Sequence, residues 1–561
     1  MTTTAIPQKQ YAVQLVGPSQ LKLNPDKDVP RPGPHQVLAK IEAVGLCFSD
    51  LKLLKQFSEH ARKKEVVKGL SEQILNGIPS YVPADKPTVP GHEVVLRIVA
   101  VGDNVKHHKV GERCIVQADY RNLRTSGSNA AFGYNFEGGL QEYVLMDERV
   151  VVDEDGERFL IPVKDDIGAS QVALVEPWAC VEDSYVTRER QSILAAGRLL
   201  VVADAGHAIE GLRESFSPDG PPASITIVCV EDVQLKAIQD LGLPVEEAID
   251  PVALPDEGFD DIVYFGASKP TLDVLNDKLA AHAIINVVKG GKRIGEPVAV
   301  GVGRVHYGPT RWIGTDSTRA DDAYRNIPPD GDIRDGDSVL VVGAGGPMGQ
   351  MHVIRNVCAG RKGVSVTGSD LDAARLAALE AKARPMAAAN NVSLRMVNSK
   401  EEKLDQAFSY YALMAPVGQL VADAIRDGAE GMIINVFAGI PAPVKHDLDL
   451  DTYIAKRAFM FGTSGSTIRD MKIVLEKVES GQLNTNASVD AIAGMSGATD
   501  GIAAVENRTM AGKIIVYPQL HDVPLIPLSE LGEHFPTVAA KLDDGQWTPA
   551  AEAELLRVAK A

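Results

Sequence analysis

The 561-residue chain has few cysteines and no long apolar run, and each shortage excludes a class of protein. Its five cysteines are scattered and odd in number, so a disulfide framework is not expected and a reducing, cytoplasmic compartment is. No run of about 18 apolar residues occurs, so we expect no membrane span. The first residues lack a basic segment followed by an apolar core, so no secretory signal is expected.

Basic residues are also fewer than acidic ones, 57 against 75. The formal net charge is −18 and the isoelectric point is near 5.2, which argues against a nucleic-acid or anionic-membrane partner, because both favour basic surfaces. Hydrophobic residues make up 45% of the chain and charged residues only 24%, the composition of a globular protein. The length is too great for one core, so about three domains are expected.

An internal repeat occupies the middle of the chain. Residues 259–290 align without a gap on residues 408–439 and share the sequence IINV. Upstream, LLVVADAG at 199–206 resembles VLVVGAGG at 339–346, and downstream WIGT at 312–315 resembles MFGT at 460–463. Three similarities in the same order indicate a duplicated unit.

Each copy alternates short apolar strands with longer amphipathic stretches, which predicts a parallel sheet covered by helices. We therefore expect two tandem Rossmann-like units, at 195–325 and 335–465. Before residue 190, short alternating segments separated by Pro and Gly turns predict an all-β, barrel-like domain. This domain, 1–190, is expected to be completed by 465–518, and 519–561 forms a C-terminal extension. The predicted fold class is thus α/β plus β.

A glycine-rich turn follows an apolar strand in the second copy. Glycines there let backbone N–H groups at a helix start approach a pyrophosphate closely. Asp370 ends the next strand, where a carboxylate would bind the adenosine ribose and disfavour a 2′-phosphate, so the segment predicts NAD(H) binding. The turn has one glycine more than the common pattern, and which three act stays open. Its candidate residues are Gly343, Gly345, Gly346, Met348 and Gly349.

The first copy has ADAGHAIEG in the same place. Asp204 would repel a phosphate there, so we expect this unit to be degenerate and to act as a structural or oligomer-forming spacer.

Three segments of the N-terminal domain carry residue types that bind metals. A thiolate, an imidazole and a carboxylate make a catalytic Zn²⁺ site with one position left for water or substrate. Each residue alone could be a buried core residue; their joint occurrence beside a dinucleotide-binding unit favours a metal. The segments are GLCFSD with Cys47, Ser49 and Asp50, PGHE with His92 and Glu93, and LVEPWAC with Glu176.

These segments, with FEGGLQEYV, resemble the zinc-containing medium-chain dehydrogenase/reductase (alcohol dehydrogenase) family, and most closely its sorbitol dehydrogenase and sorbose-1-phosphate reductase-like branch. The resemblance covers residues 10–185 and 335–518. It implies a GroES-like catalytic domain in which Cys47 and His92 bind one catalytic zinc, completed by Glu93 or Glu176. Asp50 would orient His92, and Ser49 would accept the substrate's hydroxyl proton.

The chain also departs from the family pattern. Lys52 stands where many relatives have a histidine that finishes the proton relay; an exposed lysine without that role is equally compatible. Only Cys114 lies in the region that holds a second, structural zinc in many relatives, so none is expected. The segment between Asp50 and Gly91 is longer than usual, and HARKKEVVKGLSEQIL predicts a helical stretch over residues 60–75.

The resemblance implies an enzyme that transfers hydride between an alcohol carbon of a polyol, sugar or sugar phosphate and NAD. An amino-alcohol dehydrogenase of the same fold, acting on a substrate such as threonine, is one alternative. A non-catalytic dinucleotide-binding scaffold is another. The expected partner is a small alcohol or ketone, and relatives imply a homo-oligomer.

Overall fold

The computed structural model describes residues 6–559 and divides into two compact units. Unit 1 combines residues 1–182 with residues 466–561, and unit 2 comprises residues 183–465. None of the helices within residues 6–559 is long and apolar enough to cross a membrane.

The main sheet of unit 1 pairs strands from both ends of the chain. Strand β3 lies between β5 and β26 and is antiparallel to both. Its residues are almost all buried, as its apolar sequence QVLAKIEAVG leads one to expect. In sheet order the strands are β10 (Leu160–Pro162), β6 (Arg113–Val116), β5 (Glu93–Val101), β3 (Gln36–Gly45), β26 (Lys513–Val516), β25 (Val489–Ala493) and β27 (Ile526–Pro527), with β9 (Tyr143–Asp147) also on β3.

The register of this sheet brings distant residues to one end of β3. Gly45 pairs with Glu93 on one side and with Ile515 on the other. Helix α1 (Phe48–Gln56) begins directly beyond that end, with Cys47 as its N-cap. Residues 47, 92–93 and 513 therefore meet at the same end of the sheet.

The remaining elements of unit 1 are two small sheets and a set of helices. The sheets are β1 (Lys9–Gly17) with β2 (Gln20–Asp28), and β4 (Val66–Lys68) with β7 (Asp119–Thr125) and β8 (Asn129–Ala131). The helices are α2 (Glu72–Asn76), α3 (Glu148–Val151), α4 (Ala169–Ala173), the start of α5 (Val175–Val186), α14 (Ile468–Glu479), α15 (Ala498–Asn507), α16 (Leu531–His534), α17 (Pro536–Ala539) and α18 (Pro549–Val558).

The predicted helix over residues 60–75 is wrong. That segment contains a 3₁₀ turn at Ala61–Lys63, the strand β4 and only the short helix α2. The β-branched Val66 and Val67 favour pairing with β7 over a helix. Gly69 then has a φ of +114°, and a Cβ there would lie 2.5 Å from a backbone oxygen, so a helix cannot continue through it.

The C-terminal extension is anchored in unit 1 by a buried carboxylate. Glu552 of α18 accepts hydrogen bonds from the backbone N–H groups of Ala169 and Ser170 and from the hydroxyl of Tyr517. The indole of Trp547 is fully buried and donates to the same hydroxyl at 3.0 Å.

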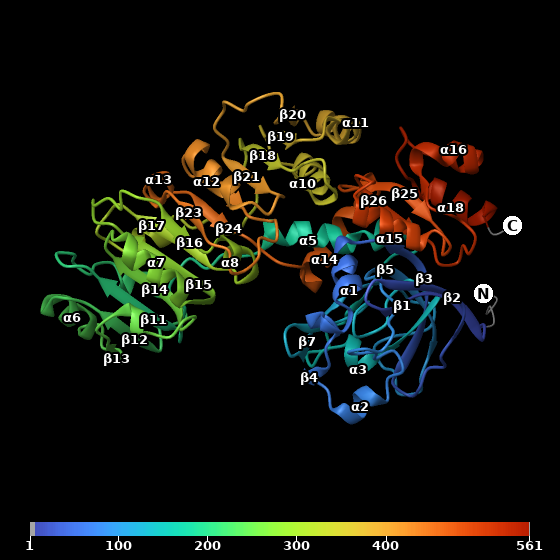
Figure 1. The fold of residues 1–561 in the computed structure, drawn as a ribbon, viewed down its shortest axis with the longest axis horizontal. Helices are drawn as coiled ribbons and strands as arrows, with labels where there is room; N and C mark the ends of the chain where they lie inside the picture. The colour runs from blue at the N-terminus through green and yellow to red at the C-terminus, as the bar shows by residue number, and fades with distance from the viewer. Residues whose placement is uncertain (1–5, 560–561) are drawn as a thin grey trace. The chain divides into compact units, whose positions relative to one another are not determined.

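Unit 2 is built on one sheet that is 12-stranded within the described residues and has two similar halves (Figure 1). Inside each half the strands are parallel. The first half runs β13 (Val245–Glu247), β12 (Ser224–Val228), β11 (Arg198–Ala203), β14 (Phe259–Phe265), β15 (Leu279–Val288), β17 (Arg311–Thr315). The second runs β24 (Phe459–Phe461), β22 (Ile433–Asn435), β21 (Tyr410–Leu413), β18 (Ser338–Val342), β19 (Ser365–Asp370), β20 (Ser393–Asn398).

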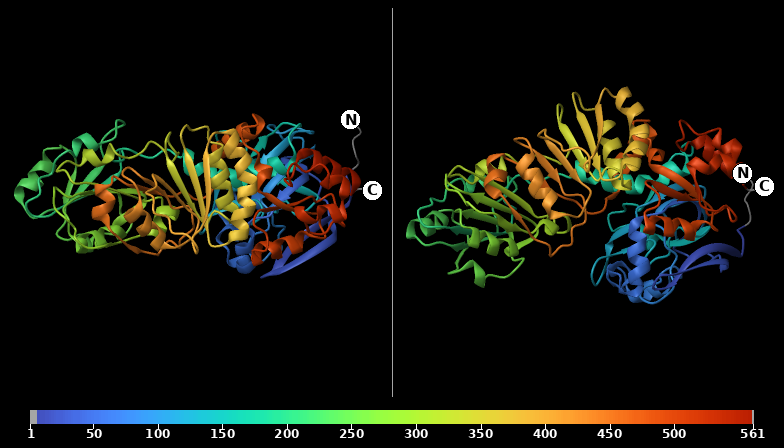
Figure 2. Two further views of the ribbon diagram at one scale, coloured as in Figure 1. Left: turned by 90° about the horizontal axis from the view of Figure 1, so that it is seen from above. Right: turned by 45° about the horizontal axis from the view of Figure 1, so that its top comes forward.

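The two halves have the same strand order, and the first strand of each, β11 or β18, lies between the second and fourth strands of its half. Helices α10 (Pro347–Val357) and α11 (Ala373–Ala389) pack on each other and on β19; both lie in the yellow to gold part of the ribbon in Figure 2. The other helices of unit 2 are α6 (Asp232–Gln239), α7 (Lys269–Lys278), α8 (Val302–Tyr307), α9 (Asp321–Tyr324), α12 (Gly418–Asp427) and α13 (Leu450–Ala455).

The halves meet at a packed seam. Trp312 of β17 pairs antiparallel with Met460 of β24, and both are buried. The Tyr453 hydroxyl donates to the Trp312 carbonyl at 2.8 Å and accepts from the Met460 N–H at 2.9 Å. A second antiparallel pair, β16 (Val298–Val300) with β23 (His446–Leu448), also joins the halves. The inner edge of each half is therefore covered by the other half.

Candidate metal centre and cofactor-binding turn

Three predicted metal ligands come together at the end of β3. One ligand atom each from Cys47, His92 and Glu93 lies within 4.8 Å of the others. His92 and Glu93 are buried, and Cys47 is half-buried. The strand register described above places His92 and Glu93 opposite the segment that leads from β3 into α1.

Asp50 links two of these residues. Its Oδ2 accepts a hydrogen bond from the Cys47 backbone N–H at 3.2 Å, as an acid in the first turn of a helix often does. Its Oδ1 lies 3.0 Å from Nδ1 of His92. This contact places the ring proton on Nδ1 and leaves Nε2 as the nitrogen with a lone pair for a metal.

Ser49 lies between the thiol and the imidazole. Its Oγ is 3.0 Å from Cys47 Sγ and 3.1 Å from His92 Nε2. Burial of the His92 ring opposes its protonation, but Asp50, Tyr134 and Cys47 together raise the pKa of His92 well above its usual value. The pocket thus favours positive charge at the imidazole, as it would favour a cation beside it.

Glu93 offers a free ligand atom. Lys513 of β26 donates to its Oε1, whereas Oε2 is buried and has no hydrogen-bond partner among the described residues. A buried carboxylate oxygen without a partner costs free energy unless something binds it. Gly45 makes room for this oxygen, since a Cβ there would lie 2.1 Å from Oε2. A thiolate, an imidazole nitrogen and an unpaired buried carboxylate oxygen are a donor set that fits Zn²⁺.

The carboxyl of Glu176, on α5, is close enough to the site for the charges of His92 and Glu93 to affect its pKa. It is buried, and this burial raises the pKa of its carboxyl to about 7 against the attraction of His92. Its oxygens are not part of the cluster within 4.8 Å. Of the two predicted candidates for the third ligand, the geometry favours Glu93.

Several neighbours of the site were not predicted from the sequence. Tyr134 is buried, and its ring centroid lies 5.9 Å from that of His92. Arg62 lies against the Tyr134 ring, with 5.8 Å between its Cζ and the ring centroid. No motif pointed to these residues or to Lys513, because only the tertiary structure brings them to the site.

Lys52 is exposed on α1 and makes no hydrogen bond or ion pair within residues 6–559. Its charge acts on His60, where burial first, then Arg62 and Lys52, lower the pKa of the imidazole to about 4. The relay role of Lys52 stays a prediction.

The glycine-rich turn joins β18 to α10 in unit 2. Gly343 has a φ of +84°, and a Cβ on Gly349 would lie 2.1 Å from the Gly343 oxygen. A Cβ on Gly345 would lie 2.8 Å from Cβ of Arg375. Around Gly346 the nearest atom would be 3.8 Å away. The turn geometry therefore requires glycine at 343, 345 and 349, but not at 346.

Asp370 is attached to this turn. Its Oδ2 accepts the Gly345 N–H at 2.8 Å, and its Oδ1 accepts the Leu371 N–H at 2.7 Å. The predicted acidic residue is thus at the edge of the predicted pyrophosphate turn. Met348 lies in the first turn of α10 and is partly buried.

The corresponding turn of the first half has a different structure. No α-helix separates β11 from β12; the described residues between them contain only a 3₁₀ turn, Arg213–Ser215. The Asp204 carboxylate accepts the Tyr264 hydroxyl at 2.6 Å. The helix N-terminus that would bind a pyrophosphate is therefore missing in this half.

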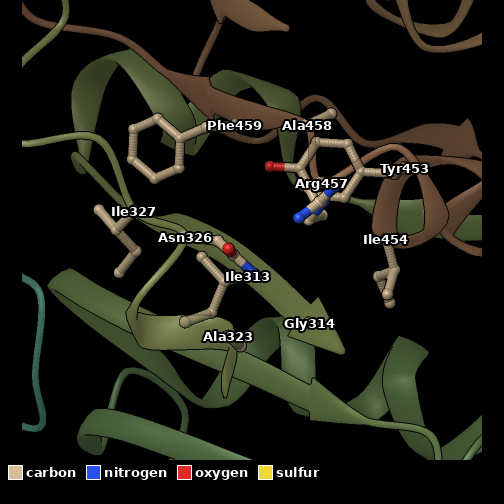
Figure 3. Close-up of a pocket in the computed structure, with 10 residues that line it drawn as sticks. All are labelled: Ile313, Gly314, Ala323, Asn326, Ile327, Tyr453, Ile454, Arg457, Ala458 and Phe459. Atoms are coloured by element: carbon tan, nitrogen blue, oxygen red, sulfur yellow. The ribbon is translucent and has the colours of Figure 1, made fainter. Parts of the chain in front are cut away.

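A small pocket on the seam of unit 2 is not a candidate site. It is lined by residues such as Ile313, Tyr453 and Phe459 (Figure 3) and has a volume of about 10 Å³. That is room for no more than one water molecule. None of the predicted site residues lines it.

Comparison with known proteins agrees with this geometry. Residues 33–155 match the alcohol dehydrogenase GroES-like domain. Over this segment the chain is similar to alcohol dehydrogenases. The matched segment holds Cys47, His92 and Glu93, so the candidate metal cluster lies inside it. The assignment to the sorbitol dehydrogenase and sorbose-1-phosphate reductase-like branch stays a prediction.

Two relatives and one crystal structure illustrate the similarity. Protein YggP of Escherichia coli K12 is 25% identical over 334 residues, 54% of this chain and 72% of its own. Mannitol-1-phosphate 5-dehydrogenase of Aliivibrio fischeri is 23% identical over 368 residues, 59% of this chain and 79% of its own. The crystal structure of 2R,3R-butanediol dehydrogenase from Bacillus subtilis aligns with a TM-score of 0.51 at 14% identity, covering 91% of this chain and 100% of that one. The last similarity concerns the fold.

Proposed function

We propose that the chain is a zinc-dependent oxidoreductase that transfers hydride between an alcohol carbon of a polyol or sugar, phosphorylated or not, and NAD. The observation that carries this proposal is the unpaired, buried Oε2 of Glu93 beside Cys47 Sγ and His92 Nε2. The names of the relatives support the substrate class, because one acts on mannitol 1-phosphate and another on butanediol.

In this proposal Cys47, His92 and Glu93 hold the zinc, and Glu176 lies beside them. Zinc held there would lower the pKa of a substrate hydroxyl or polarise a ketone, and NAD would supply the hydride chemistry. Asp50 holds Nδ1 of the His92 ring, so Nε2 would be the nitrogen that binds a metal. The Lys513 ammonium donates to Oε1 of Glu93 and compensates its negative charge, which leaves Oε2 for a metal.

Ser49 is the residue we assign to proton transfer. Its Oγ touches both the thiol and the imidazole, so a hydroxyl bound among the ligands would be within its reach. The proton passes from the substrate hydroxyl to Ser49 Oγ as the serine's own proton leaves toward solvent. Lys52 on the exposed face of α1 is the predicted end of this path.

For the cofactor, we interpret the second half of unit 2 as the NAD-binding Rossmann unit and the first half as its degenerate copy. Gly343, Gly345 and Gly349 would admit the pyrophosphate at the start of α10, and Asp370 would accept the ribose hydroxyls. The missing helix after β11 supports the degenerate state of the first half.

A substrate screen tests the proposal. The purified chain is supplied with polyols, sugars, their phosphates and threonine, with NAD⁺ or NADP⁺, and NADH formation is followed with and without a chelator. We expect polyol-type substrates to reduce NAD⁺, and chelation to stop turnover until zinc is returned. Chelator-insensitive turnover would exclude the zinc mechanism, and activity on threonine alone would favour an amino-alcohol dehydrogenase. NADH binding without metal or turnover would instead indicate a scaffold.

A further inference from the structure

Arg62 places a guanidinium on the Tyr134 ring, next to His92, and the proposed chemistry does not use this group. It lies against Tyr134, whose ring in turn lies beside that of His92. It is also near enough to Glu176 to lower the pKa of that carboxyl, though less than His92 does. The arginine therefore belongs to the surroundings of the site.

The backbone around Arg62 is fixed on both sides. The Ala61 carbonyl accepts the Thr125 hydroxyl at 2.9 Å, and the Arg62 N–H donates to Nδ1 of His60 at 3.2 Å. The Lys63 ammonium is buried and donates to the carbonyls of Val82 and Lys86. The predicted helix is replaced here by a 3₁₀ turn that these bonds hold in place. Arg62 is thus presented by a rigid segment.

The Arg62 guanidinium has few polar partners among the described residues. Its one ion pair in the described structure is a long contact of 3.4 Å to Asp119, and no hydrogen bond of its side chain is found there. The Asp119 carboxylate also forms an ion pair with Arg121 at 3.1 Å and accepts a hydrogen bond from the Asn129 side chain at 2.9 Å. The Arg62 side chain is 30% exposed, so most of its five N–H donors remain for a ligand.

Two further groups add to this arrangement. The Nδ1 of His60 accepts the Arg62 N–H, so a neutral His60 carries its proton on Nε2 and can donate it. Lys52, exposed one turn after Ser49 on α1, brings a positive charge that reaches His60. A planar guanidinium with an ammonium and an imidazole donor nearby is an arrangement that binds phosphate or carboxylate oxygens.

We propose that Arg62, assisted by Lys52 and His60, binds an anionic oxygen group, a phosphate monoester or a carboxylate, at the end of the substrate remote from the reacting alcohol. This inference rests on the proposed function and narrows its substrate class to alcohols that carry such a group.

The test compares matched substrates in the NAD⁺ assay: sorbitol, sorbitol 6-phosphate and gluconate, each with the zinc-loaded wild type, Arg62→Gln and Arg121→Gln. The control removes the same charge, another partner of Asp119 and a hydrogen bond to the Ser466 carbonyl, and the cation–π contact found on Tyr134 in the described structure comes from Arg62. We expect the wild type to prefer an anionic substrate, and the preferred one distinguishes phosphate from carboxylate. In Arg62→Gln the ratio of kcat/KM for the anionic over the uncharged substrate should fall by about 10- to 100-fold. In Arg121→Gln it should change by less than about twofold.

A second readout does not need turnover. Binding of sorbitol 6-phosphate, measured by calorimetry, should weaken in Arg62→Gln and not in Arg121→Gln. If Arg62→Gln fails to fold, Arg62→Lys keeps the charge but loses the bidentate fork, and it should lower the same ratio by a smaller factor. Equal losses on charged and uncharged substrates, or an unchanged ratio, would overturn the inference while leaving the proposed function intact. No NADH from any alcohol would instead remove the proposed function, and this inference with it.

Discussion

Asp50 holds two of the proposed zinc ligands with one carboxylate. One oxygen caps the backbone of Cys47 and the other orients the His92 ring. Partners of this kind typically change metal affinity by about 10- to 100-fold although they never touch the metal. The same side chain therefore sets where helix α1 starts and which imidazole nitrogen is presented.

Replacing Asp50 by Asn should weaken zinc binding by about 10- to 100-fold, because the neutral amide supports the imidazole less well than a carboxylate. Competition with a chromophoric chelator measures the zinc affinity. Asp470→Asn is the matched control, since Asp470 occupies the same first-turn position of α14 and accepts the Thr467 N–H, but has no histidine partner. Equal zinc affinity in both variants would show that Asp50 acts as a helix cap alone.

Residue types in short segments predicted the metal cluster, but not what surrounds it. Cys47, His92 and Glu93 lie in two segments with ligand chemistry in adjacent positions. Lys513 reaches Glu93 only through the pairing of β26 with β3, and Tyr134 and Arg62 come from loops without a motif. Such contacts depend on sheet register and loop folding, which the spacing of residues along the chain does not encode.

At the scale of elements, the geometry of the turn between β18 and α10 shows which of its four glycines are required. The sequence left open which three glycines act. The close approaches at Gly345 and Gly349 and the positive φ of Gly343 limit those positions to glycine, whereas Gly346 is open. Glycine also explains why the helix predicted over residues 60–75 does not form. Gly69 and the pairing of β4 with β7 interrupt this segment, although its composition favours a helix.

Gly349→Ala should weaken NADH binding by about tenfold or more, because its Cβ would meet the Gly343 oxygen at 2.1 Å and the turn would have to open. Fluorescence titration with NADH measures the change. Gly532→Ala is the control, since a Cβ there would have its nearest neighbour at 3.9 Å and no positive φ. Unchanged NADH affinity in Gly349→Ala would place the dinucleotide elsewhere.

At the scale of the whole molecule, the repeat in the sequence corresponds to two halves that share a sheet but not a binding turn. Only the second half has a glycine-rich turn leading into a helix. The inner edge strands β17 and β24 cover each other, which leaves β13 and β20 as the outer edges of this sheet. The predicted homo-oligomer would therefore have to use a surface other than the seam.

The stoichiometry of zinc and NADH per chain, measured on wild type and Cys47→Ser, tests the central claim most directly. Metal analysis and NADH titration should give one zinc and one NADH per wild-type chain, together with polyol oxidation. Cys47→Ser should lose zinc and turnover but still bind NADH, because the proposed NADH site is in unit 2 and Cys47 is in unit 1. Zinc-free Cys47→Ser that still oxidises the substrate at the wild-type rate, or two NADH per chain, would contradict the account.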